Sequence, residues 1–511
     1  MFWLNEIVDE IEKRHPEGEV LVQSGGSPSG TYHLGHLREL VTADAVMLEL
    51  RRRGRQAKHI YFLDDLDALR KVPVNVPDHF EKYLGQSLCD IPAPDGSESS
   101  YAEFFLKDLV DACQTLGIEI EFIRSHIKYR EGYFVTAIER SLARLDTVKQ
   151  VLESISGRKL GDDWSPIQVN EDGYLKKRPF VAIDTKAKTI SYLDKNGDTK
   201  STSYTHGEVK LDWRLDWPAR WWLMNISVEP FGRDHATKGG SYDTGVALMK
   251  EVYEAVPPVP VPYDFINMAG DTKKMSASKG TGLDMLESAE LMPPEVIRYF
   301  ILRSEPSKRL YFDPVDGLVQ LMDEYAAFSA RTDRNAGEEQ LFYVCSHGQN
   351  NSTVSRVPFS HLVASYQASL KNPERTIDVI SRTEHAEIAK ADAAIIVKEL
   401  AFIDAWLQQR APDEVKFSLL EDAPDTTTLS EQERTFLAKL GEKISTAPVD
   451  ADGEWFHKAI YELKDQSGLS PQDMFGLLYT ILIGKSSGPR AGYFLSILPR
   501  DWLIERLKKV Q

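Results

Sequence analysis

Residues 20–40 read VLVQSGGSPSGTYHLGHLREL, and this stretch decides the class of fold. Val20–Gln23 is an apolar run of strand length, and the Gly- and Ser-rich segment after it predicts a tight loop. From Leu37 the apolar residues recur at helical spacing until a plausible stop at Gly54. A second strand is predicted at 59–63, so strand, loop, helix and strand occupy about 45 residues. This βαβ unit predicts an α/β domain built on a parallel sheet.

The rest of the chain divides into regions of different pattern. Residues 118–123 predict another strand, and a long helical stretch follows near 131–153. Residues 160–210 contain short alternating segments that predict a small antiparallel insertion. From about residue 286 the periodicity is helical, and residues 356–511 are predicted to be nearly all helical.

The composition is that of a globular protein. The chain has 511 residues, 42% of them hydrophobic and 27% charged, which excludes disorder as the dominant state. At roughly 150 residues per domain, three or four domains are expected. No apolar run reaches the length of a membrane span, and the N-terminus does not have the pattern of a secretory signal. Three cysteines, Cys89, Cys113 and Cys345, favour a reducing compartment and are too few for a four-cysteine zinc site.

The charge balance is acidic overall but uneven. The net charge is −17, which by itself disfavours a nucleic-acid partner, because phosphate neutralisation drives such binding. Six basic residues nevertheless lie between 485 and 509: Lys485, Arg490, Arg500, Arg506, Lys508 and Lys509. Two interpretations stay open, a docking strip for a polyanion and the solvated end of an amphipathic helix, of which the second is commoner.

Two histidines lie in the first turn of the predicted helix. His33 and His36 are three residues apart and share one face of the turn. The N–H groups of a helix N-terminus bind anions, and Gly35 leaves room for a flat ring to approach the backbone. Such donors suit a phosphorus centre that gains negative charge in a transition state. Two surface histidines at a helix cap are the alternative.

A second cluster, KKMSASKG, occupies residues 273–280. A loop rich in Lys and Ser that ends at Gly is typical of a phosphate-binding lid, since Lys supplies a point charge and Ser supplies donors. Taken alone, it could equally be a solvated basic loop. The two clusters lie about 240 residues apart, each after a predicted strand.

Together the two clusters resemble the paired signatures of class I aminoacyl-tRNA synthetases, and the surrounding sequence resembles the class I lysyl-tRNA synthetases. The segments that carry this resemblance, which covers at least residues 1–315, are SGGSPSGTYHLGHLREL (24–40), FLDDLD (62–67), RKVP (70–73), NVP (75–77), WRLDWPARW (213–221), GRDH (232–235), GGSYDTG (239–245) and KMSASKG (274–280). Near the C-terminus, Gly488-Pro489-Arg490 is also similar to the family. His36 stands where this family often has Asn, and Ala277 stands where a second Lys is found in other class I enzymes.

The resemblance implies a fold and an order of domains. A Rossmann-type catalytic domain on a parallel sheet is expected at 1–285, with an α+β insertion at about 85–210. A helical stem-contact region at 286–355 and an all-α anticodon-binding domain at 356–511 would follow. Zinc clusters occur in the insertion of many archaeal relatives, but residues 160–210 hold no Cys and only His206, so no structural zinc is expected.

The resemblance also implies the reaction. Lysine and ATP would give lysyl-adenylate and pyrophosphate, and lysine would then pass to the terminal adenosine of tRNA(Lys), typically to its 2′-hydroxyl. Mg²⁺ would arrive with ATP, held mainly by the phosphates. We expect a monomer without membrane attachment, located in the cytoplasm.

The expected site residues fall into three groups. His33, His36 and Lys274 are the predicted catalytic residues. The predicted ATP-binding residues are Pro28, Ser29, Gly30, Gly35, Asp234, Gly239, Gly240, Met275, Ser276, Ser278 and Lys279. The predicted lysine-binding residues are Gly25, Ser27, Asp65, Trp213, Asp216, Trp217, His235 and Tyr263.

The chemistry of lysine itself demands a carboxylate. Its ε-amine has a reference pKa of about 10.4, so it enters a dry pocket as a cation. The candidates for its partner are Asp64, Asp65, Asp216 and Asp234, between which the sequence does not decide. Capping and salt bridges are the alternative for Asp64, Asp65 and Asp67, and core packing is the alternative for each Trp.

Three other functions remain possible. A glutamyl-type class I synthetase shares both signatures but needs a cationic pocket, which the Asp-rich segments disfavour. A nucleotidyltransferase with an H-x-G-H loop is usually shorter and lacks the helical tail. A non-catalytic tRNA-binding or amino-acid-sensing paralogue is disfavoured by the presence of His33, His36 and Lys274.

Overall fold

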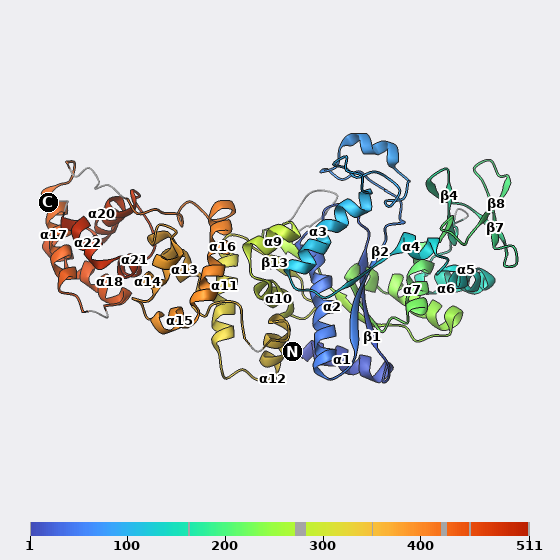
Figure 1. The fold of residues 1–511 in the computed structure, drawn as a ribbon, viewed down its shortest axis with the longest axis horizontal. Coiled ribbons are helices and arrows are strands. Elements are labelled where there is room, and N and C mark those ends of the chain that lie inside the picture. Colours follow the sequence, from blue (N-terminus) through green and yellow to red (C-terminus); the bar gives the residue numbers. More distant parts are fainter. Residues whose placement is uncertain are drawn as a thin grey trace. The chain divides into compact units, whose positions relative to one another are not determined.

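A parallel sheet forms the centre of the N-terminal part of the chain (Figure 1). The computed structural model describes residues 2–161, 164–270, 283–349, 351–420, 427–448 and 451–508. The sheet has the strand order β11-β10-β1-β2-β3, and each neighbouring pair is parallel. Its strands are β1 (Val20–Gly26), β2 (Ala57–Leu63), β3 (Glu121–Arg124), β10 (Val228–Gly232) and β11 (Val259–Tyr263).

The strand order creates a switch point beside β1. The chain runs from β1 to β2 and β3 on one side and later returns to β10 and β11 on the other. The predicted helix after β1 is α2 (Leu34–Arg52), which is buried along most of its length and packs with α1 (Phe2–Arg14). In open α/β sheets, ligands bind outside the carboxyl ends of the strands at such a point. The loops after β1 and β10 are therefore the place to look for a site.

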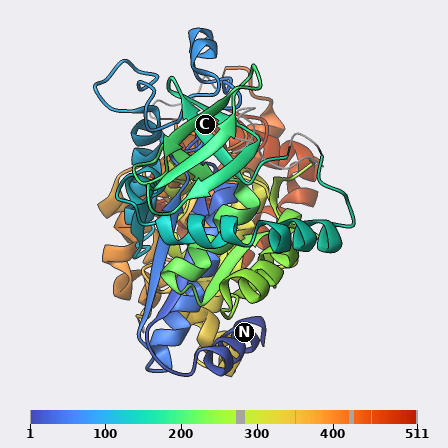
Figure 2. The ribbon, with the colours of Figure 1, turned by 90° about the vertical axis from the view of Figure 1, so that its right-hand side faces the viewer.

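The antiparallel segments predicted at 160–210 lie between β3 and β10, and their strands face the viewer in Figure 2. The insertion expected from about residue 85 starts later in the structure, because β3 pairs with β2 in the central sheet. Antiparallel strands form the two orders β5-β4-β9 and β6-β7-β8. Where one long helix is predicted near 131–153, the backbone breaks at Arg144 and two helices form. The elements are α4 (Ser125–Arg130), α5 (Val135–Ala143), α6 (Leu145–Ser156), β4 (Ile167–Glu171), β5 (Tyr174–Lys177), β6 (Phe180–Asp184), β7 (Thr189–Leu193), β8 (Thr199–Ser203), β9 (Val209–Leu211) and α7 (Trp213–Met224).

The remaining elements before residue 350 lie outside the five-stranded sheet. Between β2 and β3 lie a 3₁₀ turn, η1 (Asp78–Tyr83), and helix α3 (Tyr101–Thr115). Those that follow β10 are η2 (Arg233–Ala236), α8 (Ser241–Leu248), η3 (Met249–Tyr253), β12 (Ile266–Met268), α9 (Met285–Leu291), α10 (Pro294–Leu302), β13 (Leu310–Phe312), α11 (Asp316–Ala330) and α12 (Ala336–Cys345).

The chain divides into two compact units. One comprises Met1–Ala289, Ile297–Phe312 and Arg334–Asn350, and the other Glu290–Val296, Asp313–Asp333 and Asn351–Gln511. The described elements after residue 350 are helices: α13 (Phe359–Ala368), α14 (Pro373–Ile380), α15 (Ala386–Ala391), α16 (Ala393–Gln409), α17 (Glu431–Ser445), α18 (Gly453–Glu462), α19 (Lys464–Ser467), α20 (Pro471–Ile483), α21 (Ala491–Ile497) and α22 (Arg500–Lys508). Their buried apolar residues, such as Phe436, Leu440 and Leu482, form one core.

The structure confirms the predicted fold class, a parallel α/β domain with an α+β insertion and an all-helical C-terminal region. Among the described helices, none has both the length and the apolar character of a membrane span.

Candidate active site

The end of β1 is shaped by glycine. Gly25 pairs in register with Phe62 of β2, and a Cβ on Gly25 would lie 2.7 Å from the Phe62 carbonyl oxygen. The loop beyond it is held by two hydrogen bonds: the Ser29 N–H donates to the Ser27 carbonyl (2.8 Å), and the Tyr101 hydroxyl donates to the Ser29 carbonyl (3.0 Å). The predicted ATP-binding segment, which includes Pro28 and Gly30, is therefore a fixed loop at the switch point.

His33 and His36 cap the first turn of α2 together. The Gly35 N–H donates to His33 Nδ1 (3.1 Å), and the His33 N–H donates to His36 Nδ1 (3.0 Å). The two ring centroids lie 4.1 Å apart. Burial lowers the pKa of His33 to about 3, with a contribution from His36, and burial lowers the pKa of His36 to about 4. Both rings are therefore neutral near pH 7, and each keeps one N–H donor.

The geometry of this turn explains why residue 35 is a glycine. A Cβ there would lie 2.8 Å from both Nδ1 and Cε1 of the His33 ring. The ring that approaches the backbone is thus that of His33 itself, and a larger residue at position 35 would displace it.

Three predicted aromatic side chains gather beyond the ends of β9 and β10. Trp213 and Trp217, one turn apart on α7, stack with ring centroids 5.2 Å apart. His235 in η2 lies 5.9 Å from Trp213 and 5.3 Å from Trp217, again between ring centroids. Trp217 is almost fully buried, and its indole N–H donates to Glu229 (2.9 Å), whereas Trp213 is only half-buried. Trp213 and His235 can therefore form an apolar wall.

Glu39, which the sequence did not single out, links two predicted lysine-binding residues. Its Oε1 accepts the Gly25 N–H (2.7 Å), and its Oε2 accepts the hydroxyl of Tyr263, the last residue of β11 (2.6 Å). Burial raises the pKa of Glu39 to about 7, Tyr263 and Gly25 lower it, and Glu229 adds to the rise. Within the described part of the chain, no Lys or Arg side chain pairs with this carboxylate.

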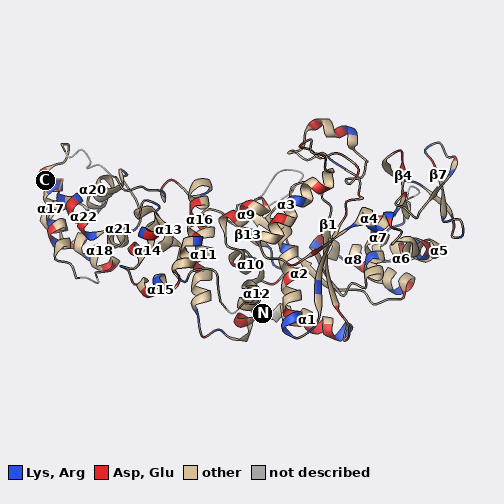
Figure 3. Ribbon diagram, in the orientation of Figure 1, with Lys and Arg blue, Asp and Glu red and all other residues tan. Residues whose placement is uncertain are grey.

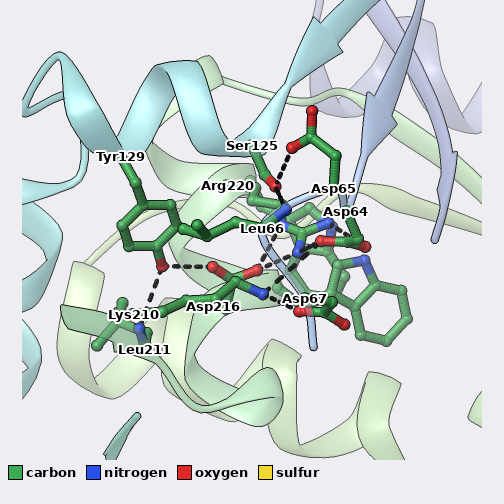
Figure 4. A network of polar contacts seen from close by, with 12 residues as sticks. Asp64, Asp65, Leu66, Asp67, Ser125, Tyr129, Lys210, Leu211, Asp216 and Arg220 are labelled. Carbon is green, nitrogen blue, oxygen red and sulfur yellow. Dashed lines mark hydrogen bonds and ion pairs between the residues drawn. The ribbon is translucent and has the colours of Figure 1, made fainter. Parts of the chain in front are cut away.

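Asp216, a predicted lysine-binding residue, already has a cation. Asp216 and Asp64 both bind the guanidinium of Arg220, and Tyr129 donates its hydroxyl to Asp216 Oδ1 at 2.5 Å (Figure 4). Although burial disfavours the charged form, the two carboxylates raise the pKa of Arg220. The guanidinium also lies 5.4 Å from the Trp213 ring centroid, so this buried network supports the aromatic wall.

The two remaining Asp residues of FLDDLD are also engaged. Asp65 Oδ1 accepts from the Ser125 hydroxyl and the His126 N–H (both 2.8 Å), at the start of α4, and Oδ2 lies 2.5 Å from His126 Nδ1 (Figure 4 shows the Ser125 contact). Asp67 pairs with the buried Lys210 of β9. Capping and pairing therefore account for Asp65 and Asp67 in the structure, and a direct contact of Asp65 with lysine stays a prediction.

The predicted adenosine-side glycines begin α8. Gly239 has a positive φ of 73°, and a Cβ there would lie 2.6 Å from the Ile155 carbonyl oxygen. The Gly240 N–H donates to the Thr237 carbonyl (2.7 Å), and Asp234 lies in η2 after β10. Asp234, Gly239 and Gly240 all follow β10, which pairs with β1 at the switch point. Nucleotides bind beyond the carboxyl ends of strands at such a point.

Part of the prediction falls outside the described residues. These are the predicted catalytic residue Lys274 and the predicted ATP-binding residues Met275, Ser276, Ser278 and Lys279.

The basic C-terminal segment is largely structural. Lys485 donates to the carbonyls of Asp413 and Lys416, Arg500 donates to Ala447 and Pro448, and Arg506 is buried against the Leu420 carbonyl. Acidic and basic residues are interspersed along these helices (Figure 3). Half of the expected strip therefore stabilises the fold instead of facing a partner.

No group of three or more His, Cys, Asp or Glu side chains is arranged to hold a metal ion in the described ranges. Cys89, Cys113 and Cys345 form no disulfide.

Comparisons with known proteins agree along the whole chain. A family model described as "tRNA synthetases class I (K)" matches residues 1–348, and one described as "Anticodon binding domain" matches residues 396–511. A protein named lysine–tRNA ligase 1 from Methanosarcina acetivorans is 35% identical, covering 100% of this chain and 98% of that protein. Proteins named lysine–tRNA ligase from Archaeoglobus fulgidus and Pyrococcus horikoshii are 34% and 31% identical, each alignment covering 99% of both chains. The chain belongs to the class I (K) family of tRNA synthetases.

Proposed function

We propose that this enzyme attaches L-lysine to tRNA(Lys) in an ATP-dependent reaction through a lysyl-adenylate. The lysine carboxylate attacks the α-phosphorus of ATP and releases pyrophosphate. A hydroxyl of the terminal adenosine of tRNA, the 2′-hydroxyl in our proposal, then attacks the carbonyl carbon and releases AMP. The names of the full-length relatives support this activity.

The observation that carries the choice of amino acid is the unpaired carboxylate of Glu39. Glu39 is half-buried, and its carboxyl group, whose pKa is raised to about 7 by loss of water, has no positive partner among the described residues. The ε-ammonium of lysine supplies one, while Gly25 and Tyr263 hold both carboxylate oxygens in place. Glutamate would bring a second negative charge to the same position, so a glutamyl-type activity is disfavoured.

We assign Glu39, and not Asp65 or Asp216, to the lysine ammonium. Asp216 is satisfied by Arg220 and Tyr129, and both oxygens of Asp65 have partners. Asp216 then acts through Arg220, which supports Trp213. The apolar stem of lysine lies against Trp213, Trp217 and His235 in this proposal, with Ser27 at the entrance.

The neutral histidines serve the first step. His33 and His36 lie at the N-terminus of α2, where backbone N–H groups and ring N–H groups meet. In the proposal their donors stabilise the negative charge that develops on the α-phosphate, and Lys274 meets the charge on the leaving pyrophosphate. ATP lies along Pro28–Gly30, Gly35, Asp234, Gly239 and Gly240, with Met275, Ser276, Ser278 and Lys279 on its phosphates. Mg²⁺ enters as part of the ATP substrate.

The C-terminal helices read the tRNA in this proposal. The family match at 396–511 supports an anticodon-binding role within the predicted domain at 356–511, and residues 286–355 would contact the acceptor stem. We further propose a monomer that works in the cytoplasm, where cysteines that form no disulfide are usual.

Charging of total tRNA with each amino acid in turn, followed by identification of the charged species, tests the proposal. We expect an ATP-dependent ester with lysine on lysine-accepting tRNA. Charging with glutamate instead would establish the rival activity. Binding of tRNA without any charging would establish the non-catalytic paralogue.

A further inference from the structure

Glu229 in β10 is a buried carboxylate to which the proposed chemistry gives no role. It is 5% exposed, and burial raises the pKa of its carboxyl group to about 7. The guanidinium of Arg220 favours the charged form of Glu229 but is bonded to Asp64 and Asp216, and Glu229 itself forms no ion pair in the described part of the chain. Burying a carboxyl group without a bonded cation costs stability, so its presence beside the proposed lysine pocket indicates a function.

Two indole N–H groups of α7 bind the carboxylate of Glu229. The Trp217 N–H donates to Oε1 at 2.9 Å, and the Trp221 N–H donates to Oε2. Trp217 and Trp221 are four residues apart, so they project from the same face of the helix. Because an indole ring has a single N–H donor and no acceptor, each oxygen of Glu229 sets the orientation of one ring.

Trp217 occupies the middle of the aromatic wall of the proposed lysine pocket. Its ring centroid lies 5.2 Å from that of Trp213 and 5.3 Å from that of His235. Trp217 is almost fully buried, whereas Trp213 and His235 are half-buried and can meet a ligand. The position of the inner ring therefore sets the positions of the two outer rings, because close-packed side chains leave little room to move independently.

The hydrogen bonds of Glu229 favour a role in the wall over a contact with the lysine ammonium. Both of its oxygens accept from α7, whereas Glu39 is bonded to the Gly25 N–H and the Tyr263 hydroxyl at the ends of β1 and β11. Glu229 also raises the pKa of Glu39, so the two carboxyl groups are close enough to repel each other when both are charged. The geometry therefore assigns the ammonium to Glu39 and the apolar stem to the wall that Glu229 holds.

We propose that Glu229 is a positioning residue for lysine recognition: it fixes the ring of Trp217 and thereby the aromatic wall that contacts the stem of the substrate. The inference rests on the proposed function for the identity of that substrate. Rings that are already held in place bind the stem without losing further rotamer freedom, so they increase affinity through preorganisation. Glu229 should therefore govern how tightly the stem binds, while Glu39 governs the need for an ammonium.

Glu229→Gln in the full-length chain tests this role. Glutamine has one acceptor oxygen for two indole donors, so at least one ring loses its partner. In tRNA charging, the KM for lysine and the inhibition constant of norleucine, which keeps the stem but lacks the ε-ammonium, should both rise about tenfold. The kcat and the KM for ATP should stay within about threefold of wild type, because the reacting groups are untouched. Trp222→Phe is the matched control: Trp222 lies on the same helix with its ring stacked on Tyr253, and its loss should change neither constant more than about twofold.

A double substitution separates positioning from other roles. Trp221→Phe removes the competing donor, so the one acceptor oxygen left by Glu229→Gln can serve Trp217. In that background, Glu229→Gln should raise the KM for lysine by less than about threefold, whereas a rise of about tenfold in both backgrounds would overturn the proposal. A rise for lysine without one for norleucine would also overturn it and make Glu229 the ammonium partner. An unchanged KM with a lower free energy of unfolding in urea would leave Glu229 a structural role only.

Failure of the proposed function would be seen separately. If the wild type charges tRNA with a different amino acid, lysine attachment is refuted, and the same variants are tested with that amino acid. An equal KM for it in Glu229→Gln and in the wild type would overturn the positioning role. A rise that Trp221→Phe suppresses would support it.

Discussion

Replacing Glu39 by Gln removes the charge that we assign to the lysine ammonium while it keeps the size of the side chain. The amide can still accept the Gly25 N–H, so the turn at the end of β1 should persist. The loss of one member of a buried ion pair costs about 3 kcal/mol or more, so the KM for lysine should rise at least roughly 100-fold. The KM for ATP should change little, because the predicted ATP residues lie on other loops.

The pKa of Glu39 also predicts in which direction the affinity for lysine changes with pH. The pKa of Glu39 is raised to about 7, so the carboxyl is mostly neutral at lower pH and ionised above. Lysine stays a cation throughout this range, so its affinity should fall about tenfold between roughly pH 8 and 6 as Glu39 takes up its proton. His33 and His36, with pKa values of about 3 and 4, stay neutral and do not contribute. The lysine affinity of Glu39→Gln should be almost independent of pH.

The assay is lysine titration by calorimetry at three pH values, together with charging kinetics at saturating ATP and tRNA. Norleucine, which lacks the ε-ammonium, serves as control ligand and should bind the variant no worse than the wild type. Lysine affinity within about threefold of wild type in Glu39→Gln would refute the assignment. If the lysine affinity of Glu39→Gln still depended on pH, the ammonium partner would be Glu229 instead, whose pKa burial also raises to about 7.

Four further substitutions test other parts of the site. His33→Ala or His36→Ala should slow adenylate formation by about 10²–10³-fold with little effect on lysine affinity, because each removes an oriented donor; near-normal single-turnover rates would exclude this role. Lys274→Ala should lower the maximal rate of adenylate formation about tenfold or more and spare transfer from preformed lysyl-adenylate; equal losses in both steps would contradict contact with the leaving pyrophosphate. Arg220→Met should lower the free energy of unfolding by about 3–5 kcal/mol, since it removes the guanidinium that both buried carboxylates bind, and urea denaturation followed by Trp fluorescence measures the loss.

The local patterns of the sequence were sufficient to predict the strand, loop and helix around the site. The run from Val20, the loop through Gly30 and the helix after His33 follow from periodicity and turn residues over a few positions, and the structure has them as β1, its loop and α2. The helical C-terminal region follows for the same reason. The prediction of one helix near 131–153 was less accurate, because periodicity does not show the break at Arg144.

The partners of the charged residues could be identified only from the tertiary structure. Asp64, Asp65 and Asp216 stand in prominent motifs, yet their neighbours Arg220, Ser125 and Tyr129 come from other elements. A sequence shows which carboxylates exist but not which of them meet a cation. The strength of a buried charge depends on that pairing and on the water removed around it, both of which are long-range properties.

Glu39 illustrates the division most clearly. It stands three residues after His36 on the same face of α2, which is the only signal the sequence carries for it. Its role emerges because β1 and β11 run parallel on either side of β10, which places their carboxyl ends at the same end of the sheet. Gly25 and Tyr263 therefore reach one carboxylate from positions more than 200 residues apart. The sequence by itself determined the βαβ unit, the two signature motifs and the family resemblance, because these are contiguous. The tertiary structure decided which carboxylate at the site lies without a cation among the described residues, because the order of strands, and not their individual patterns, sets which distant side chains share the site.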